Sequence, residues 1–146
     1  MVPIPEMFPT GLLPPGHHQC TLAEIEERFT FTERRKVLLA GLRSVLDMLP
    51  GKEAVEYVLV DGSFVEAKGE PRDVDVLVVF STKRNPLSAK RLTAWVRKWA
   101  EILHQVRCVD LYTSEESWAA EYWSGFFGAT RDGRSKGVLV LTEGWN

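Results

Sequence analysis

The segment that most constrains the fold is the run Val74–Phe80, in which Asp75 is the only polar residue. A continuously apolar strand of this length is buried on both faces. This is typical of a central strand with helices packed against the sheet, and not of a half-exposed hairpin strand. The sequence therefore predicts a layered α/β or α+β domain built around this strand.

Helical spacing and capping signals predict three helices around the strand. Thr21–Phe29 opens with a capping box, in which Thr21 is followed three residues later by a glutamate. In Thr32–Leu49 the apolar residues recur at helical spacing until a Pro-Gly pair stops the run. In Ser88–Leu103 a similar stripe includes Trp95 and Trp99, which we expect to pack into the core.

Shorter segments predict the rest of the sheet. The β-branched and apolar runs Tyr57–Asp61, Val106–Tyr112 and Val138–Leu141 are expected to be strands. A capping pattern at Thr113 predicts a further helix through about Tyr122. Together these elements predict a mixed β-sheet of about four or five strands flanked by helices.

The length of 146 residues suits a single domain covering 1–146. Residues 1–16 are rich in proline and glycine, which predicts an extended arm laid over that domain. The net charge of −2 gives no global field for nucleic acid. Neither a membrane-length apolar run nor a secretory signal is found, and Cys20 and Cys108 have no metal or disulfide spacing. We expect a cytoplasmic protein with free thiols and no membrane partner.

Gly62 and Ser63 follow the strand Tyr57–Asp61 and predict an anion site. Glycine lets the backbone approach a ligand closely, and serine adds a small hydroxyl donor. Phe64–Lys68 is long enough for one helical turn, whose amino end would favour a phosphate. Asp61 is expected to make a local turn hydrogen bond.

Asp73 and Asp75 flank Val74, and the two-residue period of a strand puts both carboxylates on one side. Two adjacent negative charges in an apolar strand are costly unless a cation lies between them. Asp110 lies in the next predicted strand and would join them if the two strands are neighbours. The three carboxylates predict a Mg²⁺ or Mn²⁺ site, and the alternative is that they are solvated acids at strand ends.

These residues resemble the nucleotidyltransferase superfamily typified by DNA polymerase beta. Its signature is a Gly-Ser pair after a strand, then Asp-x-Asp about ten residues later, then an acidic residue on a later strand; here these are Gly62, Ser63, Asp73, Asp75 and Asp110. More narrowly, three stretches look like a small, poorly characterised bacterial and phage family of such domains: Gly11–His17, Val60–Phe64 and Phe126–Gly137.

The resemblance implies a nucleotidyltransferase-like fold and transfer of a nucleoside monophosphate from a nucleoside triphosphate to a protein, RNA (for instance tRNA) or small hydroxyl acceptor. Gly62 and Ser63 would hold the phosphates. Asp73, Asp75 and Asp110 would be catalytic and bind Mg²⁺ or Mn²⁺, and Asp110 would help to take the hydroxyl proton.

Further side chains are candidates for binding the base and the phosphates of the substrate. Larger members of the superfamily carry a C-terminal helical domain, for which the chain after Asp110 is too short. A base could stack on an aromatic residue of the C-terminal part, and basic residues there could reach phosphate. His17 and His18 are expected to be structural or exposed to solvent. The candidates for stacking and phosphate binding are Tyr112, Trp123, Phe126, Phe127, Arg131, Arg134 and Lys136.

A second class of function stays open from the sequence. The minimal size also fits a catalytically silent nucleotidyltransferase-like module that binds or regulates a cognate partner protein. One half of a toxin–antitoxin or phage-defence pair is an example. Metal-dependent release of pyrophosphate would favour the enzyme, and nucleotide binding without turnover would favour the module.

Overall fold

The apolar run Val74–Phe80 forms an inner strand of a five-stranded mixed sheet. The computed structural model describes residues 4–67, 69–116, 130, 133–143 and 145. Its elements, in chain order, are β1 (Gly16–Cys20), α1 (Leu22–Phe29), α2 (Glu33–Met48), the 3₁₀ turn η1 (Lys52–Ala54), β2 (Val55–Asp61), the 3₁₀ turn η2 (Ser63–Val65), β3 (Val74–Phe80), α3 (Pro86–Arg107), β4 (Val109–Glu115) and β5 (Gly137–Leu141).

The sheet has the order β1-β5-β2-β3-β4. β2 pairs antiparallel with β3 and β5, whereas β3 pairs parallel with β4 and β1 pairs parallel with β5. The long helix α3 makes the crossover that a parallel β3–β4 pair needs. The predicted α+β fold with a mixed sheet is therefore confirmed.

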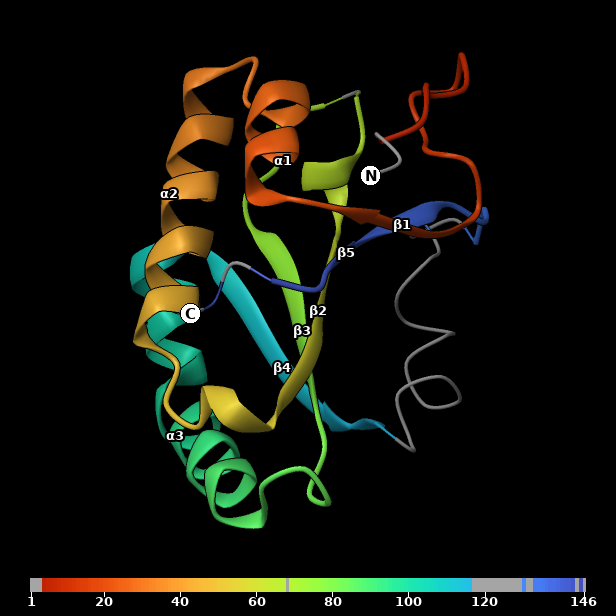
Figure 1. The fold of residues 1–146 in the computed structure, drawn as a ribbon. Coiled ribbons are helices and arrows are strands. Elements are labelled where there is room, and N and C mark those ends of the chain that lie inside the picture. The colour runs from red at the N-terminus through yellow and green to blue at the C-terminus, as the bar shows by residue number, and fades with distance from the viewer. Residues whose placement is uncertain (1–3, 68, 117–129, 131–132, 144, 146) are drawn as a thin grey trace.

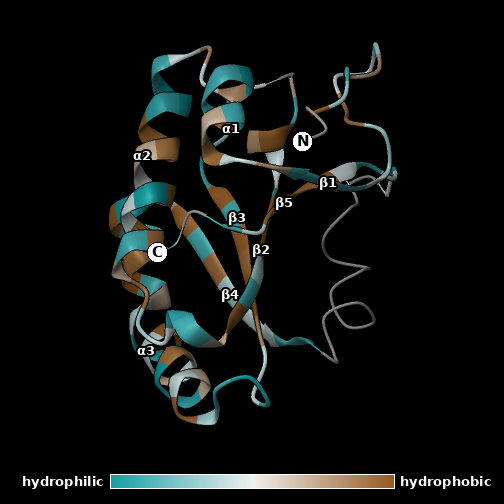
Figure 2. Ribbon diagram, in the orientation of Figure 1, coloured by the Kyte–Doolittle hydropathy of each residue, from teal (hydrophilic) through white to brown (hydrophobic). Residues whose placement is uncertain are grey.

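The described helices lie on one face of the sheet, where α1 and α2 cover one end and α3 the other (Figure 1). The main core fills this layer. It combines alternate strand residues such as Val58, Val76 and Leu111 with the inner sides of the helices. Figure 2 shows hydrophobic colour along most of β3 and β5, whereas β1 and part of β4 are hydrophilic and the helices carry both colours. Strand β3 is buried on both faces, as its sequence predicts.

Local capping signals place the helices as expected. Thr21 caps α1 with both hydrogen bonds of a capping box, and Thr32 caps α2 through its hydroxyl oxygen. Trp95 and Trp99 of α3 pack half-buried against the core. Among the described residues no helix combines the length and the apolarity that crossing a bilayer requires.

The described part of the amino-terminal arm contacts the rest of the domain. Ile4 and Leu13 are buried, and the Arg28 side chain donates hydrogen bonds to the carbonyl oxygens of Ile4 and Pro5. The arm is shorter than expected in one respect, because Gly16 already begins β1. The sequence analysis missed this strand, whose residues Gly16–Cys20 are mostly polar and lie at the edge of the sheet.

Two predicted boundaries near the end of α3 are wrong. Val106 was expected to begin a strand, but α3 continues to Arg107 and β4 begins only at Val109. Cys108 ends the helix in a left-handed conformation, with φ of 57°. Thr113 was expected to begin a further helix but belongs to β4, and the rest of that prediction, to Tyr122, falls on residues after 116 that the structure does not describe.

Candidate functional site

Three aspartates stand side by side on neighbouring strands. Asp61 at the end of β2 is in register with Asp75 of β3, and Asp75 is in register with Asp110 of β4. Asp73 lies two residues before Asp75 and so points to the same face of the strand. The structure therefore brings together the three acids that the sequence analysis selected, and adds Asp61 to the row.

The row lies on the sheet face opposite the described helices. This face also carries a small apolar cluster formed by Leu59, Leu77, Val79 and Val138. Tyr112 packs at its edge, one alternate position beyond Asp110 on β4. The carboxylates thus border an apolar surface, where a charge is poorly solvated and an interaction with a ligand is strong.

Crowding of these groups shifts the ionisation of Asp75. Burial and the neighbouring carboxylates of Asp110, Asp73 and Asp61 raise the pKa of Asp75 to about 7, and the Asp75 and Asp110 side chains are hydrogen-bonded to each other. The same carboxylates, together with burial, raise the pKa of the Tyr112 hydroxyl. A proton therefore sits on Asp75 at a pH where an isolated aspartate is ionised, and a cation could take its place.

His104 is a residue of this site that the sequence analysis missed. It lies in the last turn of α3, and its Nδ1 is hydrogen-bonded to Oδ1 of Asp110. Ligand atoms of Asp73, His104 and Asp110 all lie within 4.8 Å of one another. The sequence analysis did not place His104 near Asp110 because the predicted helix ended at Leu103. In the structure α3 continues to Arg107 and so includes His104.

Gly62 and Ser63 lie directly beside the aspartates. Gly62 has φ of 87° and ψ of −172°, a conformation that residues with a side chain rarely adopt. A Cβ atom at this position would lie 2.8 Å from Oδ2 of Asp75. Ser63 is exposed and begins the 3₁₀ turn η2, which replaces the expected helical turn over 64–68; Lys68 lies outside the described residues. The backbone at Gly62 is therefore held against the acidic row.

Lys136 reaches the same loop from the residue before β5. Its Nζ donates hydrogen bonds to the Gly62 carbonyl oxygen at 2.9 Å and to Oε2 of Glu66 at 2.7 Å, and it lies 3.2 Å from Oδ1 of Asp61. Lys136 and Asp61 are both almost completely buried. Lys136 was expected to reach a phosphate of a bound nucleotide; it lies beside Gly62, and its ammonium contacts three groups of the chain. Asp61, for which a local turn bond was expected, pairs with this distant lysine.

Arg35 of α2 holds the loop after Gly62 from its buried side. The sequence analysis did not select this residue. Its side chain is completely buried, and its guanidinium donates to the carbonyl oxygens of Phe64 at 2.7 Å and Glu66 at 2.6 Å. Longer hydrogen bonds of 3.4 Å reach Ser63 and Gly69. The sequence contains a signal for this role, because Arg35 is spaced by one helical turn from the buried residue Leu38 and so occupies the apolar face of α2.

The remaining candidates are distributed around the molecule. His18 Nε2 lies 2.6 Å from the Pro14 carbonyl oxygen, which fits the structural role expected for it. His17 lines an open groove of about 380 Å³ over β1, β5 and β2, together with Gln19, Tyr57, Val140 and Thr142. Arg134 is exposed. The predicted stacking and phosphate residues Trp123, Phe126, Phe127 and Arg131 lie outside the described part of the chain.

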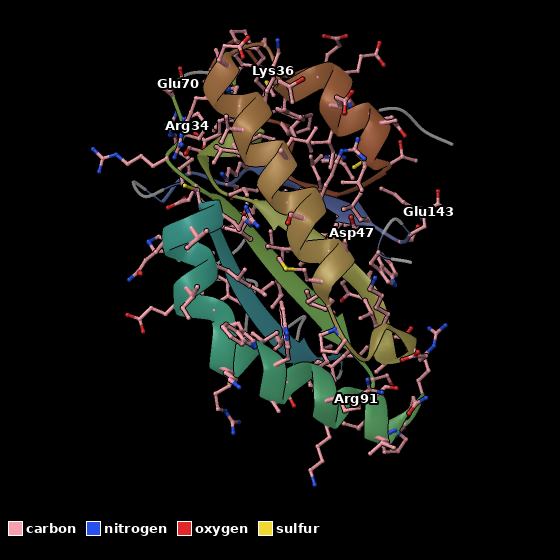
Figure 3. All side chains as sticks on the ribbon, turned by 90° about the vertical axis from the view of Figure 1, so that its left-hand side faces the viewer. Arg34, Lys36, Asp47, Glu70, Arg91 and Glu143 are labelled. Atoms are coloured by element: carbon pink, nitrogen blue, oxygen red, sulfur yellow. The ribbon has the colours of Figure 1, made fainter. Side chains whose placement is uncertain are left out.

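The two cysteines are free, as expected from their spacing. Cys20 is buried at the end of β1, and burial raises the pKa of its thiol to about 12. Cys108 is half-buried, and its Sγ accepts a hydrogen bond from the guanidinium of Arg34. Arg34 also donates to the carbonyl oxygens of Pro71 and Arg72, and it lies close to Glu70 at this end of the molecule (Figure 3). It thereby ties α2 to the segment that leads into Asp73.

Comparison with known proteins gives one match. A family model described as "Family of unknown function (DUF6932)" matches residues 5–142. Searches of curated proteins and of solved structures find no match. The match spans the arm, the glycine loop, the aspartates and Lys136, so the site lies within the part of the chain that the family shares.

Proposed function

We propose that this chain, which belongs to the DUF6932 family, is a metal-dependent nucleotidyltransferase. It would move a nucleoside monophosphate from a nucleoside triphosphate to a hydroxyl group of a protein, an RNA or a small molecule. The observation that supports this most directly is the placement of Asp73, Asp75 and Asp110 on one sheet face beside the backbone of Gly62.

The donor set fits a divalent cation of the Mg²⁺ or Mn²⁺ type. Asp75 and Asp110 are hydrogen-bonded, which requires a proton between two groups that repel each other when both are ionised. Asp73, Asp75 and Asp110 are the residues that would hold the cations. When bound, they would screen charge on the triphosphate and acidify the acceptor hydroxyl.

The chain's own groups supply positioning and proton transfer. Gly62 carries no side chain, so its backbone lies against the Asp75 carboxylate, beside which the triphosphate would be held through the cations. Ser63 is exposed and can donate its hydroxyl to that phosphate. The side chain of Asp110 is part-exposed, and we assign its carboxylate as the base that accepts the proton of the attacking hydroxyl. Lys136 and Arg35 hold the loop in place from its buried side.

A second candidate is a nucleotidyltransferase-like binding module that has lost turnover. One observation favours it: the Lys136 ammonium is engaged by Gly62, Glu66 and Asp61 instead of facing an open phosphate site. In this case the domain would bind a nucleotide or a cognate protein, as in a toxin–antitoxin pair, without releasing pyrophosphate.

The test is transfer of label from α-labelled nucleoside triphosphates with Mg²⁺ or Mn²⁺. Label is followed into the protein itself and into the protein and RNA fractions of a bacterial lysate. The Asp73→Asn plus Asp75→Asn double variant is expected to lose transfer while keeping its fold, because it removes two repelling charges. Asp47→Asn, an exposed acid on α2 far from the row (Figure 3), is the matched control and should transfer normally.

The possible results separate the two candidates. Label that enters an acceptor with the wild type and the Asp47 variant, but not with the double variant, supports the enzyme. Equal transfer by a folded double variant would exclude the proposed site. Metal-dependent triphosphate binding without any transfer would favour the binding module.

A further inference from the structure

His104 brings a nitrogen atom to a site that the nucleotidyltransferase proposal describes with oxygen ligands alone. Its imidazole is 53% exposed and comes from α3, whereas Asp73 precedes β3 and Asp110 belongs to β4. The ligand atoms of these three side chains lie within 4.8 Å of one another. Three separate parts of the chain therefore converge on one point.

The spacing is close to that of ligands around one ion. Nitrogen and oxygen ligands lie about 2.0–2.2 Å from a small divalent cation, so ligand atoms on its opposite sides are about 4 Å apart. The ligand atoms lie within 4.8 Å of one another, and Nδ1 of His104 is in hydrogen-bond contact with Oδ1 of Asp110, so an ion would replace this hydrogen bond as the two atoms move apart. The side chains of His104 and Asp110 are exposed and part-exposed, which allows this movement.

We propose that His104, Asp73 and Asp110 form a mixed nitrogen–oxygen cation site that prefers Co²⁺ or Zn²⁺ over Mg²⁺. Mg²⁺ strongly favours oxygen ligands, whereas imidazole suits the later first-row ions. The inference rests on the proposed function for the roles of the two aspartates. It adds a ligand and a choice of metal to that same site.

The test measures metal binding to the full chain without nucleotide. After treatment with a chelator, Co²⁺ is added and its visible absorption is followed, while Mg²⁺ binding is measured by calorimetry. His104→Ala is expected to weaken Co²⁺ binding by about tenfold or more and to change Mg²⁺ binding by less than about twofold. His17→Ala removes another exposed imidazole and is the matched control, which should bind both ions like the wild type.

A second measurement identifies the ligand directly. The chain has three histidines, His17, His18 and His104, so the ring signals in a proton–carbon NMR spectrum are few. Zn²⁺ is expected to shift one imidazole strongly, and the His104→Ala variant should lack that signal. His104→Gln keeps a polar side chain of similar reach. It is expected to weaken Co²⁺ binding as His104→Ala does, which would show that the weaker binding reflects loss of the imidazole and not a local change of fold.

The outcomes separate this inference from the function on which it builds. Equal Co²⁺ affinity of the wild type and His104→Ala, or a Zn²⁺ shift on another imidazole, overturns the mixed site even if nucleotidyl transfer is found. Co²⁺ binding through His104 in a protein that transfers no nucleotide supports the mixed site and counts against the enzyme. Failure of the wild type to bind Co²⁺ more tightly than Mg²⁺ overturns the preference.

Discussion

Replacement of Arg35 by methionine tests whether a buried cation holds the loop that carries Gly62. The guanidinium lies beneath the segment 62–69 and donates to four of its carbonyl oxygens. It also lies over the ring of Phe31, with its central carbon 4.3 Å from the ring centroid. Methionine has a similar length and fills apolar space well, so the change removes the donors with little loss of volume.

The expected loss of stability is worked out from the two short hydrogen bonds of Arg35. The distances to Phe64 and Glu66 are 2.7 and 2.6 Å, and bonds made by a charged donor contribute about 1.5–3 kcal/mol each. Their sum is about 3–6 kcal/mol. Methionine also avoids the desolvation cost of a buried charge, which offsets part of the loss. We expect the free energy of unfolding to fall by about 3 kcal/mol.

The assay is urea unfolding followed by circular dichroism. With a slope of about 2 kcal/mol per molar urea, a loss of about 3 kcal/mol lowers the midpoint by about 1.5 M. The expected fall in Tm is about 6–12 °C. Arg43→Met is the matched control on the same helix. Arg43 forms an exposed ion pair with Glu26, so its loss should change stability by less than about 1 kcal/mol.

Two results would refute this reasoning. An Arg35 variant as stable as the Arg43 variant would show that the loop carbonyls are satisfied equally well without the guanidinium. A destabilised variant with unchanged triphosphate and Mn²⁺ affinity would show that Arg35 supports the fold but does not position the loop for binding.

Three further predictions concern the site itself. Because the pKa of Asp75 is about 7 in the folded protein and lower in the unfolded chain, metal-free wild type should lose stability as pH rises from about 4 through 7. Asp75→Asn should lack this decline, and urea midpoints at pH 5 and 8 that change equally in both proteins would contradict it. Gly62→Ala should cost about 1–3 kcal/mol in backbone strain and displace the Asp75 carboxylate, so that both stability and Mn²⁺ affinity fall. Gly133→Ala, at a similar φ of 85° with no atom within 4 Å of its Cβ, should lower stability alone, and equal Mn²⁺ affinity of the two variants would count against a close contact at Gly62. Lys136→Met should destabilise the protein by about 3–5 kcal/mol in urea unfolding, because Asp61 is left buried without its cation; a change below about 1 kcal/mol would show that Asp61 takes up a proton or another partner at little cost.

Features with a local cause could be predicted from the sequence. The bounds of β3 are those predicted, because its apolar run is continuous and ends at polar residues. The capping box at Thr21 likewise needs only residues within one turn. The side-by-side placement of Asp75 and Asp110 was predicted on the condition that their strands are neighbours, and the parallel register meets that condition.

Features that depend on tertiary contacts were not predicted. β1 is a polar edge strand, and its pairing with β5 joins residues from opposite ends of the chain. The end of α3 carried no stop signal, because Cys108 and not a glycine takes the left-handed position after the helix. This misplaced boundary also hid His104, which faces Asp110 only because the helix continues to Arg107.

The distribution of charge around Gly62 links these observations to the proposed chemistry. On the buried side of the loop, Arg35 and Lys136 are engaged by backbone carbonyls, Glu66 and Asp61. On the other side, burial and the neighbouring carboxylates of Asp110 and Asp73 raise the pKa of Asp75, and Asp61 adds to this effect. The unliganded fold therefore carries an electrostatic cost at Asp75 that a proton relieves at low pH and that a divalent cation would relieve at neutral pH. A cation that binds only the folded state at a concentration one hundred times its Kd would stabilise it by about 2.7 kcal/mol. Metal binding would thus be coupled to the stability of the strands that hold Asp75 and Asp110.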